Sequence, residues 1–157
     1  MQPRASCGGF RKVKRFQETH VAVPHGHRGR RSGVVFHSSV DLLDYDILRR
    51  DDGISLTTPI RTVFDLTSLV RRDELESVIE QCLDQQMFAV ADLHRIARRL
   101  AKGERKGSGT FVELIGQRPA DQRPVTPTMS SGSLERWNRA VSHRSSARCT
   151  FACRTVR

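Results

Sequence analysis

The chain has 157 residues, of which 37% are hydrophobic, and a formal net charge of +10. This length suits one domain with tails, and no apolar run approaches the about 18 residues of a membrane span. The first residues lack the apolar segment of a secretory signal. We therefore expect a cytoplasmic protein without a membrane partner, whose four cysteines stay reduced.

The positive charge lies mainly in the two flanks. Residues 1–19 hold five Lys or Arg and one acidic residue (+4), residues 20–118 hold fifteen and fourteen (+1), and residues 119–157 hold seven and two (+5). Basic flanks displace counterions from phosphates, which predicts weak, nonspecific DNA binding through these arms. We expect a disordered basic arm at 1–19, a folded domain at 20–118 and a linker at 119–132. Residues 133–157 are expected to be either a disordered tail or the remnant of a further domain.

Strand patterns come first along the folded part. Residues 20–24 alternate apolar and polar positions, and residues 33–39 are β-branched and aromatic, so both predict strands. The glycine-bearing polar loop between them suggests a hairpin with a long connection. Residues 41–52 predict a single helical turn or an irregular loop, in which five acidic residues form a solvated surface rather than a cation site, since the EF-hand spacing is missing.

Residues 53–59 predict a third strand that leads into a helix, with Thr58 as N-cap and Pro59 at the first helical position. Apolar positions extend this helix to residue 70. The spacing of Leu75, Val78, Ile79, Cys82 and Leu83 predicts a second helix that starts at Asp73, with Glu76 completing a capping box.

Two further helices are predicted over 91–102 and 110–117 from their apolar stripes. Cys82 lies in the apolar pattern of the second helix and is expected to be a buried thiol. The elements together predict an α/β (α+β) fold, a small sheet of two or three strands packed on three or four helices.

Candidate chemistry is sparse. Four histidines lie in the first forty residues, but without supporting Cys or acidic ligands we interpret them as polar loop and strand residues; Cys149 and Cys153 likewise lack a second ligand pair for zinc. No catalytic motif is present, so we expect no enzyme, metal or cofactor. Candidate nucleic-acid contacts are Arg28, Arg30 and Arg31 in the first loop, and Arg95, Arg98 and Arg99 on the third helix. For the helix arginines we favour the solvated face of an amphipathic helix over phosphate contacts.

One stretch resembles a known family. The strand that ends in His37 and Ser39, and the segment GISLTTPIRTVFDL that follows, are similar to the core of actinobacterial AbiEi-type antitoxin proteins over about residues 20–118. The matching residues of the second segment are Gly53, Thr57, Pro59, Arg61, Thr62, Asp65 and Leu66, and the helix with Leu75, Glu76 and Asp84 is similar to the family's next segment. We interpret Arg61 and Asp65, one helical turn apart, as a structural pair rather than a catalytic dyad.

The resemblance implies a non-enzymatic antitoxin and transcriptional regulator whose partner is a nucleotidyltransferase toxin. Many such proteins continue into a nuclease-like domain similar to very-short-patch-repair endonucleases, which opens with Ser-x-Leu-Glu. Here Gly132 replaces that serine, Glu135 stands for the first acidic residue, and the later metal-binding acids are missing. The family's winged helix-turn-helix would not fit in residues 1–19, so we expect a member truncated at both ends. The alternatives are an inactive nuclease remnant and a small basic nucleic-acid-binding protein.

Overall fold

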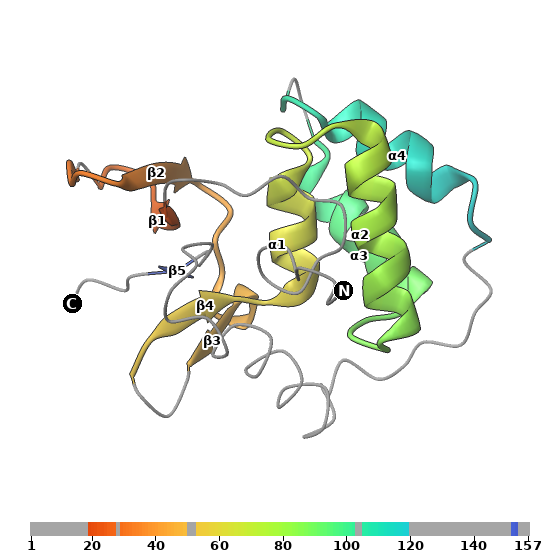
Figure 1. Cartoon of the computed structure of the whole chain (residues 1–157), viewed down its shortest axis with the longest axis horizontal. Helices are drawn as coiled ribbons and strands as arrows, with labels where there is room; N and C mark the ends of the chain where they lie inside the picture. The colour runs from red at the N-terminus through yellow and green to blue at the C-terminus, as the bar shows by residue number, and fades with distance from the viewer. Residues whose placement is uncertain (1–18, 28, 50–52, 103–104, 120–151, 154–157) are drawn as a thin grey trace, which may run out of the picture.

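The computed structural model describes residues 19–27, 29–49, 53–102, 105–119 and 152–153. The predictions for the arm at 1–18, Arg28, most of the linker, and Glu135 lie outside these residues. Within the described part the fold is mixed α+β, as predicted, with a sheet at one side and four helices at the other (Figure 1).

The sheet has five strands in the order β2-β1-β5-β4-β3, more than the two or three expected. They are β1 (Thr19–Pro24), β2 (Val34–Ser39), β3 (Ile47–Arg49), β4 (Ser55–Thr57) and β5 (Ala152–Cys153). The sequence reading missed β3 and β5, because three and two residues are too short to show a periodicity. β5 comes from the predicted tail, and its backbone pairs with both β1 and β4.

The predicted hairpin is wrong, because β1 and β2 run parallel, from the pair Thr19 and Val34 to the pair Pro24 and Ser39. The nine residues between the strands (25–33) reach about 30 Å when extended, more than the about 20 Å length of a six-residue strand. They therefore suffice to return the chain to the start of the sheet. Positive φ angles at Gly26 (+90°) and Gly33 (+73°) make the turns of this connection.

The turn and helix start that were predicted after β2 are confirmed. A 3₁₀ turn, η2 (Asp44–Asp46), lies within 41–52, and β4 leads into α1 (Pro59–Leu66) with Thr58 at the N-cap and Pro59 at the first position. The Thr58 hydroxyl forms no capping hydrogen bond. The helix ends four residues earlier than predicted, because the N–H and the hydroxyl of Thr67 both donate to the carbonyl of Phe64.

The other helices are α2 (Arg72–Asp84), α3 (Val90–Leu100) and α4 (Ser108–Gly116). The predicted capping box of α2 is displaced: Arg71 is the N-cap, and its N–H donates to the Glu74 carboxylate at 3.1 Å. The apolar faces of all four helices form one core, in which Phe64 and Phe111 meet edge to face at 5.2 Å. Cys82 is fully buried as predicted, and burial raises the pKa of its thiol.

Candidate functional site

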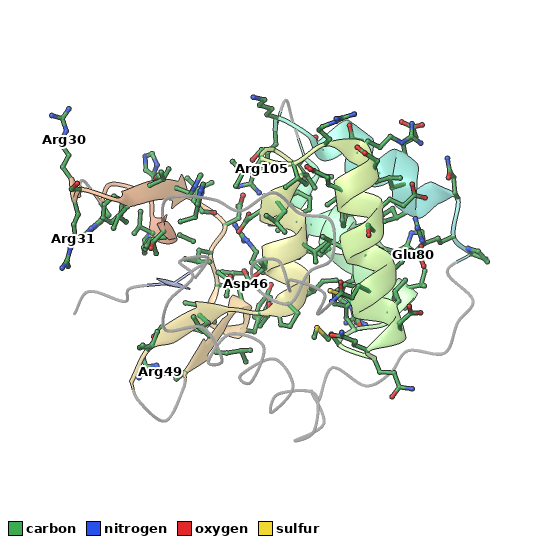
Figure 2. The ribbon with its side chains drawn as sticks, in the orientation of Figure 1. Arg30, Arg31, Asp46, Arg49, Glu80 and Arg105 are labelled. Atoms are coloured by element: carbon green, nitrogen blue, oxygen red, sulfur yellow. The ribbon has the colours of Figure 1, made fainter. Side chains whose placement is uncertain are left out.

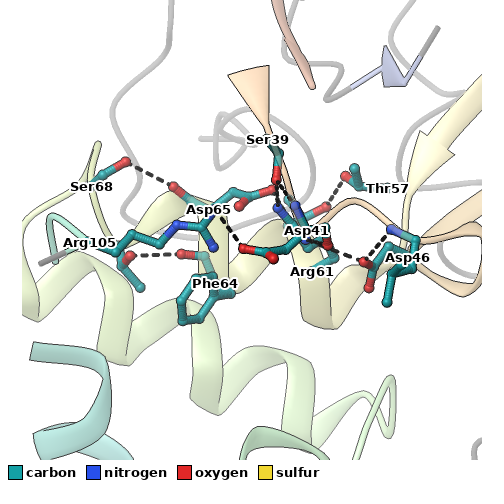
Figure 3. Close-up of polar contacts among 12 residues, drawn as sticks. Ser39, Asp41, Asp46, Thr57, Arg61, Phe64, Asp65, Ser68 and Arg105 are labelled. Carbon is teal, nitrogen blue, oxygen red and sulfur yellow. Dashed lines mark hydrogen bonds and ion pairs between the residues drawn. The ribbon is translucent and has the colours of Figure 1, made fainter. Parts of the chain in front are cut away.

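Residues of the family-like motif meet where the end of β2, the turn η2 and the helix α1 come together. Ser39 lies at the end of β2, Asp46 closes η2, and Arg61 and Asp65 project from α1 (Figure 3). Arg61 is the centre of this cluster, and only 1% of it is exposed. A buried guanidinium is costly unless its donors are satisfied, so its partners determine what the site is.

Each nitrogen of the Arg61 guanidinium has a partner. Nε donates to Oδ2 of Asp65 at 2.9 Å, and Nη2 donates to Oγ of Ser39 at 2.9 Å. Nη1 donates to the backbone carbonyl of Asp41 at 2.9 Å and to Oδ2 of Asp46 at 3.3 Å. The planar fork of one arginine therefore ties α1 to a strand end, a loop and a turn, a pattern that lysine does not reproduce.

A second arginine shares the Asp46 carboxylate. Arg99 of α3 donates from Nη2 to Oδ1 at 2.5 Å and from Nη1 to Oδ2 at 3.0 Å. Its Nη1 also donates to the Tyr45 hydroxyl at 2.8 Å, and its guanidinium lies 4.8 Å from the centre of the Tyr45 ring. Asp46 is only 2% exposed, and bidentate pairing with one arginine plus contact with another compensates its burial.

The buried Asp46 corrects one prediction. The acidic residues of 41–52 were expected to form a solvated loop, and Asp41 and Asp44 are exposed as expected, but Asp46 is in the interior. Asp51 and Asp52 lie outside the described residues. The sequence contains no local signal for this, because in DLLDYDIL the apolar Leu43 and Tyr45 are exposed while the acidic Asp46 is buried, the reverse of the ordinary pattern.

His37 and Asp65 form the outer side of the cluster, next to the sheet. Burial raises the pKa of Asp65, and the nearby Arg61, Arg105 and His37 act in the opposite direction. Burial lowers the pKa of His37, with Asp65 opposing the shift. Nδ1 of His20 and Nε2 of His37 are 2.8 Å apart, and the two rings stack at 5.0 Å.

The remaining motif residues determine the start of α1. The hydroxyls of Thr57 and Thr62 are 2.7 Å apart and buried, and Pro59 occupies the first helical position. Sequence reasoning missed Arg105, which lies between α3 and α4. Its guanidinium lies 3.8 Å from a carboxylate oxygen of Asp41 and 5.6 Å from the centre of the Phe64 ring.

The polar groups at the centre of the cluster are paired with one another. Ser39 Oγ accepts hydrogen bonds from Arg61 and from the backbone N–H of Asp41, and all the carboxylate charge of Asp46 faces arginines. Among the described residues, no group of three or more His, Cys, Asp or Glu is placed to hold a metal ion. The arrangement is suited to holding segments in place, and the Arg61–Asp65 pair is in contact as expected.

Loop residues next to this cluster are exposed and apolar. Val40 is 70% exposed, Leu43 43% and Tyr45 65%. All three lie within residues 40–45, which we call the 40–45 loop, between the two Arg61 partners Ser39 and Asp46. Large apolar side chains that gather on a well-anchored loop are typical of interaction sites.

Those candidate nucleic-acid contacts that the structure describes do not form one surface. Arg30 and Arg31 are exposed on the β1–β2 connection, at the end of the sheet farthest from the helices (Figure 2). Arg95 and Arg98 are exposed on α3, where Arg95 pairs with Asp92 at 2.7 Å. Arg99 is bound to Asp46, so its charge is used inside the protein.

Comparisons with known proteins add no family assignment: no family model, curated protein or solved structure matches this chain. In the part of the chain that the structure describes, no helix has the length and apolar character needed to cross a membrane.

Proposed function

We propose that residues 20–118 form a non-enzymatic protein-binding domain of the AbiEi antitoxin type, which presents the 40–45 loop to a toxin in the cytoplasm. One observation carries the proposal: a buried arginine network anchors an exposed apolar loop at both ends. Three of the motif residues that carry the family resemblance take part in this anchor, namely Ser39, Arg61 and Asp65.

Anchoring favours binding because it reduces the entropy lost on association. Arg61 contacts Ser39 before the loop, the carbonyl of Asp41 within it and Asp46 after it. The backbone N–H of Leu43 also donates to the Asp46 carboxylate at 3.1 Å. A loop held in this way presents Val40, Leu43 and Tyr45 without first having to become ordered.

Tyr45 and Arg99 are the expected centre of the interface. Tyrosine and arginine are enriched among residues that dominate binding energy, because both combine apolar contact with a polar group. Here the guanidinium lies over the exposed ring, and the hydroxyl accepts its hydrogen bond. A partner that covers the ring adds contact area to a side chain whose position is already fixed.

The resemblance supplies the expected partner, a nucleotidyltransferase toxin. Weak DNA binding through the basic arms is a second, separate proposal, which rests on the formal charges of +4 in residues 1–19 and +5 in residues 119–157. Such binding would weaken steeply with salt and show no sequence preference.

Calorimetric titration with a purified nucleotidyltransferase toxin of the kind that the resemblance implies tests the main proposal. Tyr45→Ala and Leu43→Ala should each weaken binding about 10-fold or more, as loss of a central contact does. Val112→Ala is the matched control, because Val112 is 46% exposed but lies on α4, away from the loop.

If all three variants bind with the wild-type Kd, the interface does not include the 40–45 loop. No binding by the wild-type chain, or affinity only for DNA that disappears at high salt, would contradict the antitoxin proposal. The first result would favour the inactive remnant, and the second would favour the nucleic-acid alternative.

A further inference from the structure

The outer edge of β2 is the longest uncovered strand edge in the described part of the sheet. β2 and β3 are the two edge strands, but they differ in length. β3 has three residues and ends in Arg49, whereas β2 has six and reads VVFHSS, without Lys, Pro or an acidic residue. Proteins normally shorten or charge such edges to prevent unwanted pairing, and β2 has neither protection.

Backbone groups on this edge are free to pair. Thr19 N–H donates to the carbonyl of Gly33 and His25 N–H to that of Ser39, so the odd-numbered residues of β2 face β1. Because pairing alternates along a parallel strand, Phe36 and Ser38 direct their N–H and C=O groups outward. No residue that the structure describes pairs with these groups.

The sequence around the β2 edge is positively charged, which favours an acidic partner. No Asp or Glu occurs between Glu18 and Asp41, whereas Arg28, Arg30 and Arg31 lie in this stretch. Arg30 and Arg31 are exposed and form no ion pair within the described residues, and Figure 2 shows both side chains pointing away from the rest of the molecule. Strand addition at an open edge takes its affinity from main-chain hydrogen bonds and its specificity from neighbouring side chains.

We infer that the β2 edge binds an extended acidic segment of another protein, which adds to the sheet as a sixth strand beside Phe36–Ser38, because the N–H of Val34 already donates to the carbonyl of Arg31. The chain's own flanks fit poorly, because residues 1–19 and 119–157 carry net positive charges. This surface does not use the side chains of the 40–45 loop. Failure of either proposal therefore leaves the other standing.

Fluorescence anisotropy with the full chain tests the inference, using a labelled ten-residue peptide that alternates valine and glutamate. Ser38→Pro removes an outward N–H, and it should weaken binding about tenfold, whereas Ser38→Ala, which keeps that N–H, should stay within about twofold. Arg30→Gln together with Arg31→Gln should weaken binding about fivefold. The matched pair Arg95→Gln with Arg98→Gln removes the same charge from α3 and should have no effect.

Changes in the peptide keep the test valid if Ser38→Pro unfolds the chain. N-methylation of alternate peptide residues, which blocks main-chain pairing, should abolish binding, and lysine in place of glutamate should do the same. Equal binding of the methylated and unmethylated peptides would overturn the inference. So would tighter binding of a single-stranded DNA oligonucleotide than of the peptide, or a wild-type dimer in sedimentation that Ser38→Pro separates, since a second copy would then occupy the edge.

Discussion

The arginines of the helical half and those of the β1–β2 unit lie in opposite electrostatic surroundings. Arg61 and Arg99 converge on one buried carboxylate, and the donors of Arg61 bind four different residues. Arg30 and Arg31 lie in a stretch without a single acidic residue. The same type of side chain thus stabilises the fold where it is buried against a carboxylate, and it is exposed where the surrounding sequence holds no acidic residue.

Removal of the Asp46 carboxylate should destabilise the helical half of the protein strongly. Asp46→Ala leaves Arg61 and Arg99 without their shared carboxylate, so we expect the free energy of unfolding to fall by about 3–5 kcal/mol. Asp44→Ala is the control, because it removes the same charge from an exposed position of the same turn. Urea unfolding measures both, and equal losses would show that the network contributes nothing beyond a surface charge.

Replacement of arginine by lysine should reduce stability at the buried Arg61 and leave it almost unchanged at the exposed Arg30. Arg61→Lys keeps the charge but loses the planar fork that contacts Ser39, Asp46 and Asp65, so it should cost about 2 kcal/mol of stability. Arg30→Lys should change stability by less than about 0.5 kcal/mol. Thermal and urea unfolding of the pair test this, and a stable Arg61→Lys protein would mean that charge alone holds the cluster.

The weakest effect that we expect is a dependence of the free energy of unfolding on pH, which arises from His37. Burial lowers the pKa of His37 below its ordinary value of 6.5, so the unfolded chain takes up a proton at a higher pH than the folded chain. Stability should therefore fall as the pH drops through 6.5, and it should level off below the folded pKa. Among the described residues, His20, which contacts the His37 ring, and Asp65 are titratable groups that lie close to it.

Urea unfolding at pH 7.5, 6.5 and 5.5 (about one pH unit on either side of the ordinary histidine pKa) measures this effect. His37→Gln should reduce the fall seen in the wild-type chain, and His25→Gln, in the exposed loop, controls for the loss of a histidine. Identical pH profiles for His37→Gln and the wild-type chain would contradict the assignment.

Local patterns in the sequence predicted the helices well. The stripe from Leu75 to Cys82 and the Thr58–Pro59 helix start are confirmed, because capping and amphipathic spacing are properties of neighbouring residues. The hairpin prediction failed because nothing local to residues 20–39 distinguishes parallel from antiparallel pairing. β3 and β5 carried too few residues for a pattern.

The candidate site was predictable only in part. The resemblance identified Ser39, Arg61 and Asp65, which do meet, but Asp46 and Arg99 join them across 53 positions of sequence. No local sequence pattern indicates that two residues so far apart are in contact in the folded chain. The surroundings of Arg99, and with them its structural role, were therefore beyond the reach of local patterns.

That separation also affects the order of events during synthesis. At about 5–20 residues per second, the ribosome needs about 3–10 s to proceed from Asp46 to Arg99. During this interval the nascent chain holds the carboxylate without its bidentate partner, and Tyr45 lacks the cation that lies over its ring. A chain in translation thus acquires the final form of the 40–45 loop only after α3 has emerged, when most of residues 20–118 have already been made.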